Sequence, residues 1–373
     1  MRQQGDRLRR AIRKLHLWLG LGLGGLLVLL GLTGSVLVFY PELDAMLHPE
    51  ILSAGDAPPD WDRALATVRT EFPEKRGPWR FEVSDRPGAI PARYYNPPER
   101  EGHAFRPLMV WLSPDGSAVL RRDYWGEYAV TVVYDLHYRL LLGAVGGKIV
   151  GWAGLPLLAL LLSGIWAWWP RAWSRVSWGK ALRFKRQAHR QRTLRDWHKL
   201  AGLGGSAFLI LLTGTGIMLA LPEESDAVLG AAGLRMNHAP IVQGDDRAAS
   251  DIRPSQAVAI ARAALPGARL AWIEAPAASG GAWRMRMQVP GDPSFRFPHS
   301  YVWVDGASGA VLAVQDARTA AAGSIVNAWL HPLHDGSAGG LAGRILAALA
   351  GLVPLLLFVT GWLRWRSRRR ARQ

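Results

Sequence analysis

Four long apolar segments limit what this 373-residue chain can fold into: residues 17–39, 149–169, 203–221 and 345–363. Each is long enough for one helical crossing of a bilayer, which takes about 20 consecutive apolar residues. Because backbone polar groups in lipid must be satisfied within their own segment, the sequence predicts an α-helical bundle of four transmembrane helices. The first segment follows a basic start, as in a signal peptide. Its apolar run is too long for one and no small-residue cleavage pattern follows, so we expect an uncleaved anchor.

Basic residues are concentrated beside these segments. Three stretches hold 22 of the 45 Lys and Arg residues: 1–14, 170–199 and 364–373. They contain only two acidic residues, Asp6 and Asp196, which is the positive-inside pattern of membrane proteins. We therefore expect cytoplasmic termini, surrounding membrane lipid and no nucleic-acid partner, although the formal net charge is +16. Residues 41–145 and 223–340 then lie outside the bilayer, in the periplasm if the chain is an inner-membrane protein of a Gram-negative bacterium.

The two outside regions show the same order of predicted elements. The first reads as a helix and four strands, at residues 61–72, 79–83, 92–95, 108–112 and 118–121. The second repeats this order at residues 254–264, 269–274, 283–289, 300–304 and 310–315. A turn stands before the last strand of each region, with Asp115-Gly116 in the first and Asp305-Gly306 in the second. Each outside region is therefore predicted to be a small α+β module.

The membrane segments repeat as well. A shift of 182 residues places His16, Gly20, Gly22, Thr33 and Gly34 on His198, Gly202, Gly204, Thr215 and Gly216. A shift of 197 residues places His137, Gly143 and Ser163-Gly164 on His334, Gly340 and Thr360-Gly361. Each half of the chain therefore reads as helix, outside module, helix, in one orientation. This predicts an internal tandem repeat whose halves are related by an axis along the membrane normal.

Four histidines occupy repeat-related positions at opposite membrane faces. His16 and His198 stand at the inner ends of the first and third predicted membrane helices, and His137 and His334 stand on the outer approaches to the second and fourth. A lone His at a membrane edge is more often an interfacial or packing residue. In each of these two repeat-related pairs, however, a pseudo-twofold axis would bring the two members face to face. Helical bundles hold cofactors between facing side chains, and neutral imidazole is a good ligand of iron.

We therefore predict two bis-His b-type haems, an inner one held by His16 and His198 and an outer one held by His137 and His334. The chain has no Cys, which excludes thiolate-ligated haem and covalent haem attachment. His331 competes with His334 as an axial ligand because it lies about one helical turn earlier. The repeat aligns His331 with a tyrosine, so His334 is favoured.

Two glycines and two cations complete the predicted haem sites. Gly20 and Gly202 each follow an inner histidine by four residues, on the same helix face, and are predicted to clear room for the porphyrin. Close helix packing is the alternative explanation for them. Lys148 and Arg344 lie near the start of the second and fourth membrane segments and are predicted to neutralise haem propionates. The alternative is that they are snorkelling or topology residues.

These features together resemble the PepSY-associated transmembrane proteins, an iron-regulated inner-membrane group that includes siderophore reductases. The resemblance rests on His16 with Gly20 and Gly22, on the repeat of this motif at His198, and on helix–module–helix units that end in Asp135-Leu136-His137 and Leu333-His334-Asp335. It runs from about residue 8 to residue 366. It implies a PepSY-like module in each outside region, haem in the membrane, and reduction of a ferric siderophore in the periplasm. It carries over no siderophore-binding residue.

The expected protein is thus a haem-dependent ferric-siderophore reductase that releases Fe(II), with no catalytic side chain identified. No flavin or nicotinamide site is evident, so the expected electron donor is quinol or a separate cytoplasmic reductase. Two alternatives remain: a non-catalytic PepSY membrane protein that binds a periplasmic partner, and a transporter subunit. The lack of intramembrane acidic residues for ion coupling weakens the transporter interpretation.

The expected segments are 1–40 (basic start and first span), 41–135 (module 1), 136–169 (outer ligand segment and second span), 170–197 (basic cytoplasmic loop), 198–221 (third span), 222–328 (module 2), 329–366 (outer ligand segment and fourth span) and 367–373 (basic cytoplasmic tail).

Overall fold

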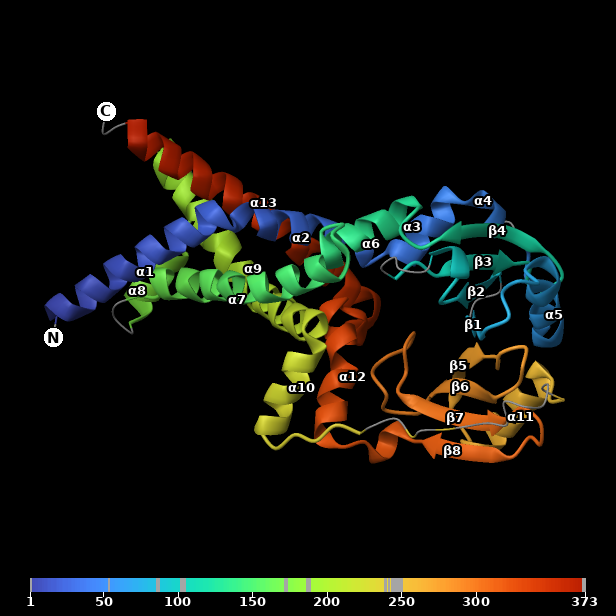
Figure 1. Ribbon diagram of the computed structural model, residues 1–373. Helices are drawn as coiled ribbons and strands as arrows, with labels where there is room; N and C mark the ends of the chain where they lie inside the picture. Colours follow the sequence, from blue (N-terminus) through green and yellow to red (C-terminus); the bar gives the residue numbers. More distant parts are fainter. Residues whose placement is uncertain are drawn as a thin grey trace. The chain divides into compact units, whose positions relative to one another are not determined.

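The computed structural model describes residues 2–52, 54–84, 88–100, 105–170, 174–185, 189–237, 240, 242 and 251–370 (Figure 1). The chain forms two compact units. The helical unit consists of Met1–Phe39, Val133–Glu224 and Leu333–Gln373, and the sheet unit consists of Tyr40–Val132 and Ser225–Pro332.

The helical unit is built from long apolar helices. Its main elements are α1 (Arg2–Gly22), α2 (Gly24–Leu37), α7 (Gly143–Trp168), α9 (Arg190–Ala220) and α13 (Gly340–Arg370), with the short α8 (Arg175–Leu182) and η3 (Ser337–Gly339). Among the described residues, three helices are long and apolar enough to cross a membrane: α7, α9 and α13 together with η3. The pair α1 and α2 becomes a fourth candidate if it is counted as one broken span.

The break between α1 and α2 lies at Leu23 and bends the pair by 59°. Four glycines surround it, at positions 20, 22, 24 and 25. Glycine lowers helix propensity by about 1 kcal/mol per residue relative to alanine, and sharp kinks occur at such positions. The predicted first span at 17–39 is therefore not a single straight helix.

Small residues allow the long helices to pack closely. A Cβ atom on Gly31 of α2 would collide with the backbone of Gly351 on α13, and a Cβ on Gly154 of α7 would collide with Ile217 of α9. Between α2 and α13, the hydroxyl of Ser35 also donates to the carbonyl oxygen of Ala348 at 2.7 Å. Close approach through small residues and hydroxyl hydrogen bonds is how membrane helices associate.

The sheet unit contains one antiparallel sheet of eight strands in the order β4-β3-β2-β1-β5-β6-β7-β8 (Figure 1). The strands are β1 (Trp79–Glu82), β2 (Ile90–Tyr94), β3 (Leu108–Leu112), β4 (Val119–Tyr124), β5 (Arg269–Glu274), β6 (Ala282–Gln288), β7 (Ser300–Asp305) and β8 (Val311–Gln315). All eight correspond to strands predicted from the sequence. The two modules are not separate sheets, however, because β1 pairs with β5 in the register Arg80↔Glu274 and Phe81↔Ile273. This pairing satisfies backbone groups that would otherwise form an open edge in each module.

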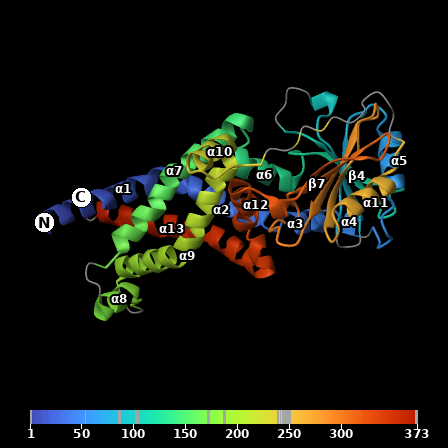
Figure 2. The ribbon, with the colours of Figure 1, turned by 90° about the horizontal axis from the view of Figure 1, so that it is seen from below.

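Helices α5 (Trp61–Glu71) and α11 (Pro254–Ala264) pack on one face of this sheet (Figure 2). Both were predicted from the sequence, at residues 61–72 and 254–264. Their apolar sides join the large buried side chains of the strands, among them Trp79, Phe81 and Trp283, in one hydrophobic core. Asp62 on α5 accepts hydrogen bonds from the backbone N–H of Ser255 at 2.8 Å and from its hydroxyl at 2.7 Å, at the first turn of α11.

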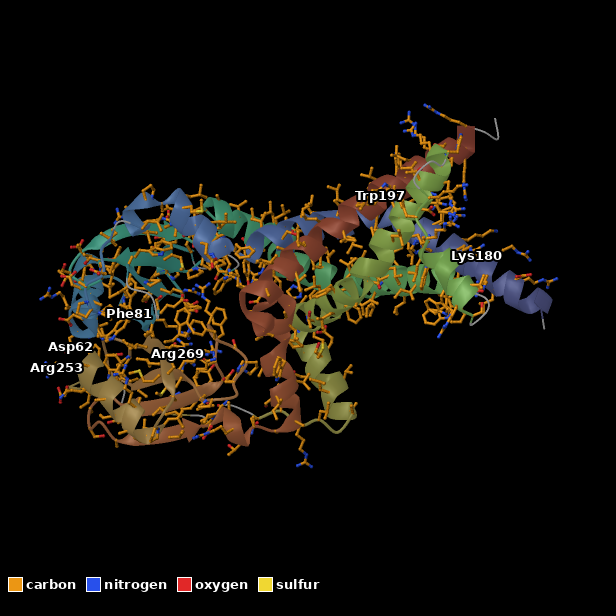
Figure 3. All side chains as sticks on the ribbon, turned by 180° about the vertical axis from the view of Figure 1, so that it is seen from behind. Asp62, Phe81, Lys180, Trp197, Arg253 and Arg269 are labelled. Atoms are coloured by element: carbon orange, nitrogen blue, oxygen red, sulfur yellow. The ribbon has the colours of Figure 1, made fainter. Side chains whose placement is uncertain are left out.

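Arg253 lies beside the same carboxylate of Asp62, at 3.7 Å (Figure 3). The remaining short elements are α3 (Tyr40–Leu47), α4 (Pro49–Leu52), η1 (Pro98–Arg100), α10 (Pro222–Ala231) and η2 (Ala317–Thr319). Two further helices, α6 (Ala129–Arg139) and α12 (Ala322–His334), carry the outer pair of predicted histidines in their last turns.

Candidate functional site

The four predicted histidines form two close pairs in the helical unit. The ring centroids of His16 on α1 and His198 on α9 are 6.1 Å apart, with an interplanar angle of 85°. Those of His137 on α6 and His334 on α12 are also 6.1 Å apart, at 53°. The structure thus brings together the same partners that the repeat in the sequence pairs.

Each inner histidine is held through Nδ1 by a second helix of the helical unit. His16 Nδ1 lies 3.1 Å from the carbonyl oxygen of Leu160 and 3.1 Å from Ser163 Oγ, both on α7. His198 Nδ1 lies 3.0 Å from the carbonyl oxygen of Leu357 and 3.0 Å from Thr360 Oγ1, both on α13. Because a carbonyl oxygen only accepts, Nδ1 carries the proton in both rings.

Each outer histidine is held through Nδ1 by a threonine. Thr33 Oγ1 on α2 lies 2.9 Å from His137 Nδ1, and Thr33 donates its own hydroxyl proton to the carbonyl oxygen of Leu29 at 2.7 Å. Thr215 Oγ1 on α9 lies 3.0 Å from His334 Nδ1 and donates to the carbonyl oxygen of Leu211 at 2.8 Å. With the hydroxyl proton committed, the threonine oxygen accepts from Nδ1–H.

The same tautomer therefore follows for all four rings. A neutral imidazole with a proton on Nδ1 has its lone pair on Nε2. Donation of Nδ1–H to a carbonyl or hydroxyl is the arrangement that fixes a metal-binding histidine and makes its other nitrogen more basic. Two such rings that face each other can bind one metal ion between them.

A glycine lies against each histidine ring. A Cβ atom on Gly34, Gly164 or Gly216 would be 3.0 Å from Cε1 of His137, His16 or His334 respectively. Gly361 has the same relation to His198, at 3.4 Å. A methyl group at 3.0 Å is tighter than nearly all real contacts, so a larger residue would displace the ring.

The role of these hydroxyl residues and glycines in holding the rings was missed in the sequence. Each histidine contacts a dipeptide made of Ser or Thr followed by Gly: Thr33-Gly34, Ser163-Gly164, Thr215-Gly216 and Thr360-Gly361. All four occur within the apolar segments at positions that the repeat aligns. Their recurrence was the available signal, but a sequence does not tell which helix faces which.

Gly20 and Gly202 have a different environment from these four. A Cβ on Gly20 would meet only Leu160 Cδ1 at 3.7 Å, and a Cβ on Gly202 would meet only Leu357 Cδ2 at 3.5 Å. Both distances are ordinary van der Waals contacts. The packing of the described protein atoms therefore gives no reason for glycine at either position.

The two cations predicted for the propionates already have protein partners. Lys148 Nζ lies 2.9 Å from Glu224 Oε1 and 3.4 Å from Glu223 Oε2. Arg344 donates to the carbonyl oxygen of Val38, just after the end of α2, at 2.7 Å, and its guanidinium lies 4.4 Å from the ring centroid of Phe39. The alternative ligand His331 is exposed and packs on Phe297, with centroids 6.2 Å apart, whereas His334 faces His137.

Other histidines do not join these pairs. His48 and His299 lie beside carboxylates of the sheet unit, and His189 caps the start of α9. His103 and His238 lie outside the described residues. Within the described part of the chain, no group of three or more His, Cys, Asp or Glu side chains is arranged to hold a metal ion. Within the described residues, neither pair therefore has a third side chain of these four types beside it.

Comparison with known proteins identifies a family for this chain. A family model described as PepSY-associated TM region matches residues 13–368, nearly the whole chain. No curated protein matches the sequence. The matched range contains both histidine pairs, the four Ser/Thr-Gly dipeptides and all eight strands.

Proposed function

This membrane protein belongs to the PepSY-associated TM family, and from this premise we propose that it is a dihaem oxidoreductase of the bacterial inner membrane. Electrons enter from the cytoplasmic side or the quinol pool and leave to a ferric siderophore in the periplasm, where Fe(II) is released. In this proposal the termini and the basic stretch around α8 are cytoplasmic, and the sheet unit is periplasmic.

One observation supports the proposal most strongly: the four histidines donate Nδ1–H to the protein and keep Nε2 for a metal. Two imidazoles bound to one metal at about 2 Å per bond, the length known for zinc, hold their ring centroids roughly 6 Å apart. Both pairs have a centroid distance of 6.1 Å. Since each pair offers only two ligands among the described residues, a porphyrin suits it by supplying the other four. When bound, haem iron carries one electron at a time by alternating between Fe(III) and Fe(II).

The positions of the two pairs suit transfer across a membrane. His198 belongs to the inner pair, and Thr215, which holds the outer pair through His334, lies 17 residues later on α9. This separation is about 25 Å along the helix axis, and the hydrocarbon core of a bilayer is about 30 Å thick. We propose that α1 and α2 form one broken span of a four-helix bundle. The matching contacts of the two halves favour an internal repeat.

The remaining predicted residues have supporting roles in this proposal. Gly20 and Gly202 would leave room for the inner porphyrin, which would be a steric reason for glycine at positions where the described protein atoms give none. Arg344 and Lys148 are the cations nearest the outer ends of their helices, and each would share its charge between its present partner and a propionate. Each ferric ion takes up one electron and becomes Fe(II), which hard oxygen chelators hold far less tightly. A quinol that gives two electrons and releases two protons therefore serves two ferric ions.

The haem content of the purified protein tests this proposal. Protein expressed with ample haem and purified in detergent is expected to contain two haems per chain and to show a b-type reduced-minus-oxidised spectrum. His16→Ala or His198→Ala should remove the inner haem and leave the outer one. His137→Ala or His334→Ala should remove the outer haem and leave the inner one. His189→Ala, in a histidine outside both pairs, is the control. Protein without any haem would overturn the proposal.

Substrate reduction requires a second measurement. The chemically reduced protein should be reoxidised by a ferric siderophore under anaerobic conditions and should stay reduced with the gallium complex of the same siderophore. Gallium(III) resembles Fe(III) in size and charge but does not accept an electron. Equal reoxidation by both complexes, or by neither, would exclude the siderophore-reductase activity while leaving the haem assignment untouched.

A further inference from the structure

The sheet face opposite α5 and α11 carries arginines in two cross-strand rows. Side chains alternate along a strand, so the neighbours of the core residues point to this second face. The first row runs over β2, β1, β5 and β6 and contains Arg93, Arg80, Glu274 and Arg284 in register. The second row runs over β1, β5, β6 and β7 and contains Glu82, Trp272, Arg286 and Tyr301 in register. Strands from both halves of the chain therefore contribute to one surface.

Positive charge exceeds negative charge on this surface. We use the name arginine face for five arginines and two tyrosines: Arg80, Arg93, Arg284, Arg286, Arg296, Tyr95 and Tyr301. Within the described residues, two carboxylates form ion pairs with these arginines. Glu82 pairs with Arg93 at 3.2 Å and with Arg296 at 2.6 Å, and Glu274 pairs with Arg80 and with Arg284, the latter at 2.7 Å. Four of the five guanidinium groups thus share two carboxylates, and Arg286 pairs with neither of them.

Two of the arginines show where the excess charge lies. Arg286 donates to the backbone carbonyl oxygens of Phe297 and Pro298 rather than to a carboxylate. Arg93 is 5% exposed, and within the described residues its Nε has no hydrogen-bond acceptor. Like charges on adjacent strands cost free energy, and a buried donor without a partner costs about 1–3 kcal/mol. An anion bound at this face would offset the repulsion between the arginines on adjacent strands.

Aromatic rings hold the guanidinium groups in place. The Cζ atom of Arg80 lies 4.0 Å from the ring centroid of Tyr95, and that of Arg286 lies 5.2 Å from the ring centroid of Tyr301. The side chains of Arg80 and Arg284 remain 30% and 34% exposed. Guanidinium groups that are fixed but still accessible lose little entropy when they bind a ligand.

The chemistry of this surface selects one kind of ligand. A guanidinium forms paired, charge-assisted hydrogen bonds with carboxylate and other anionic oxygens, and tyrosine rings stack on planar groups. Several guanidiniums within one face match a rigid molecule with several anionic oxygens. A neutral or cationic molecule would not neutralise the excess positive charge of these arginines.

We propose that the arginine face binds ferric chelates that carry net negative charge, with the iron held by catecholate or carboxylate oxygens. The inference rests on the proposed reductase function, because it assigns the substrate class and its docking surface. The binding itself requires no electron transfer. It can therefore be tested separately from the haem sites.

The test uses the full chain in detergent and two gallium complexes that do not undergo reduction. One is a tris-catecholate, which is an anion, and the other is a trihydroxamate without net negative charge. Isothermal titration is expected to show tighter binding of the anionic complex, and the difference should shrink as the salt concentration rises. Arg286→Gln and Arg284→Gln should each weaken binding of the anion about tenfold or more, the loss expected for one charge-assisted hydrogen bond. Binding of the trihydroxamate complex should be unchanged.

Matched variants keep the test decisive. Arg262→Gln changes an exposed arginine on α11 and should leave both affinities unchanged. Glu274→Gln releases two guanidiniums from their carboxylate and should strengthen anion binding, an effect opposite to that of a damaged fold. Haem spectra of all variants should match the parent protein. Equal affinity for the two complexes, or weaker anion binding after Glu274→Gln, would overturn the inference even if both haems are present. Protein without haem would overturn the proposed function alone.

Discussion

Thr33 Oγ1 accepts the Nδ1 proton of His137 at 2.9 Å while it donates its own proton to the carbonyl oxygen of Leu29. This relationship settles which nitrogen of the ring is available to a metal. A second copy of it, between Thr215 and His334, holds the other ring of the outer pair at 3.0 Å. Two threonines thus determine the state of two histidines on other helices.

We expect Thr33→Val to weaken haem binding at the outer pair about 10–100-fold, as loss of a partner that orients a metal-binding histidine does elsewhere. Valine has nearly the shape of threonine but cannot accept the Nδ1 proton. The haem content and the midpoint potential of each haem are the measurements. Thr33→Ser keeps the oxygen and should behave as the parent protein. Equal changes at both haems, or equal effects of Val and Ser, would contradict the assigned role.

Gly34→Ala should also remove the outer haem while the inner one stays. The added methyl group would lie 3.0 Å from Cε1 of His137 and would push the ring out of line with His334. The split between the two haems is read from the spectrum of the purified variant. Gly179→Ala is the matched control, because a Cβ there has no neighbour within 4 Å. Retention of both haems in Gly34→Ala would show that the ring does not need this close contact.

Asp62→Ala should lower the stability of the sheet unit by about 1 kcal/mol, the usual cost of losing a side chain that caps the first turn of a helix. Its carboxylate accepts two hydrogen bonds from Ser255 at the start of α11. For a unit of this size the loss corresponds to a Tm lower by about 2–4 °C, followed by tryptophan fluorescence. Asp226→Ala, at an exposed position of α10, should not change Tm. A similar decrease in both variants would refute the capping role.

Glu82 should make the protein less stable as the pH rises between about 4.5 and 6. Burial raises the pKa of Glu82 from 4.5 to about 6, although Arg93 opposes this. Its charged neighbours are Arg93 and Arg296, and Arg296 also contacts Tyr40. In this pH range the folded state binds more protons than the unfolded state, so the free energy of unfolding falls with rising pH, by up to about 2 kcal/mol.

Glu82→Gln removes this titration. Relative to the parent protein, the variant should therefore gain stability between pH 4.5 and 6, measured as the difference in Tm at each pH. Glu71→Gln, at an exposed position on α5, is the control and should follow the parent protein at every pH. A constant difference between Glu82→Gln and the parent across this range would show that folding does not shift the pKa of Glu82.

Local patterns in the sequence predicted most of the individual elements. Helix α11 begins and ends where predicted, because Pro254 starts it and Pro266-Gly267 follows its amphipathic stretch. The apolar segments located the long helices but not their ends. Helix α9 begins at Arg190, before both the apolar segment at 203–221 and the expected third span at 198–221, because a helix continues through charged residues where hydropathy falls. His198 therefore lies within a helix rather than at its mouth.

Contacts between residues far apart in the chain were harder to predict from the sequence. The histidine pairs could be predicted because the repeat duplicated them, and the pairing in the structure is the same. Nothing local indicates that Ser163 contacts His16, since the two lie on different helices and 147 residues apart. The joining of the two modules into a single sheet could not be predicted for the same reason, because the sequence of an edge strand does not indicate which strand will pair with it. The bend at Leu23 was obscured because glycines are common in straight membrane helices as well.

The pairing of β1 with β5 imposes a delay on biosynthesis. Glu82 ends β1 and Arg269 begins β5, so 186 residues separate the two strands. At roughly 5–20 residues per second, a ribosome needs about 10–40 s to make this stretch. During that interval the first half of the sheet has an unpaired edge that is open to strands of other chains. Co-translational protection of β1 is therefore a requirement of this architecture, and the nascent chain is most vulnerable to aggregation between the appearance of its two halves.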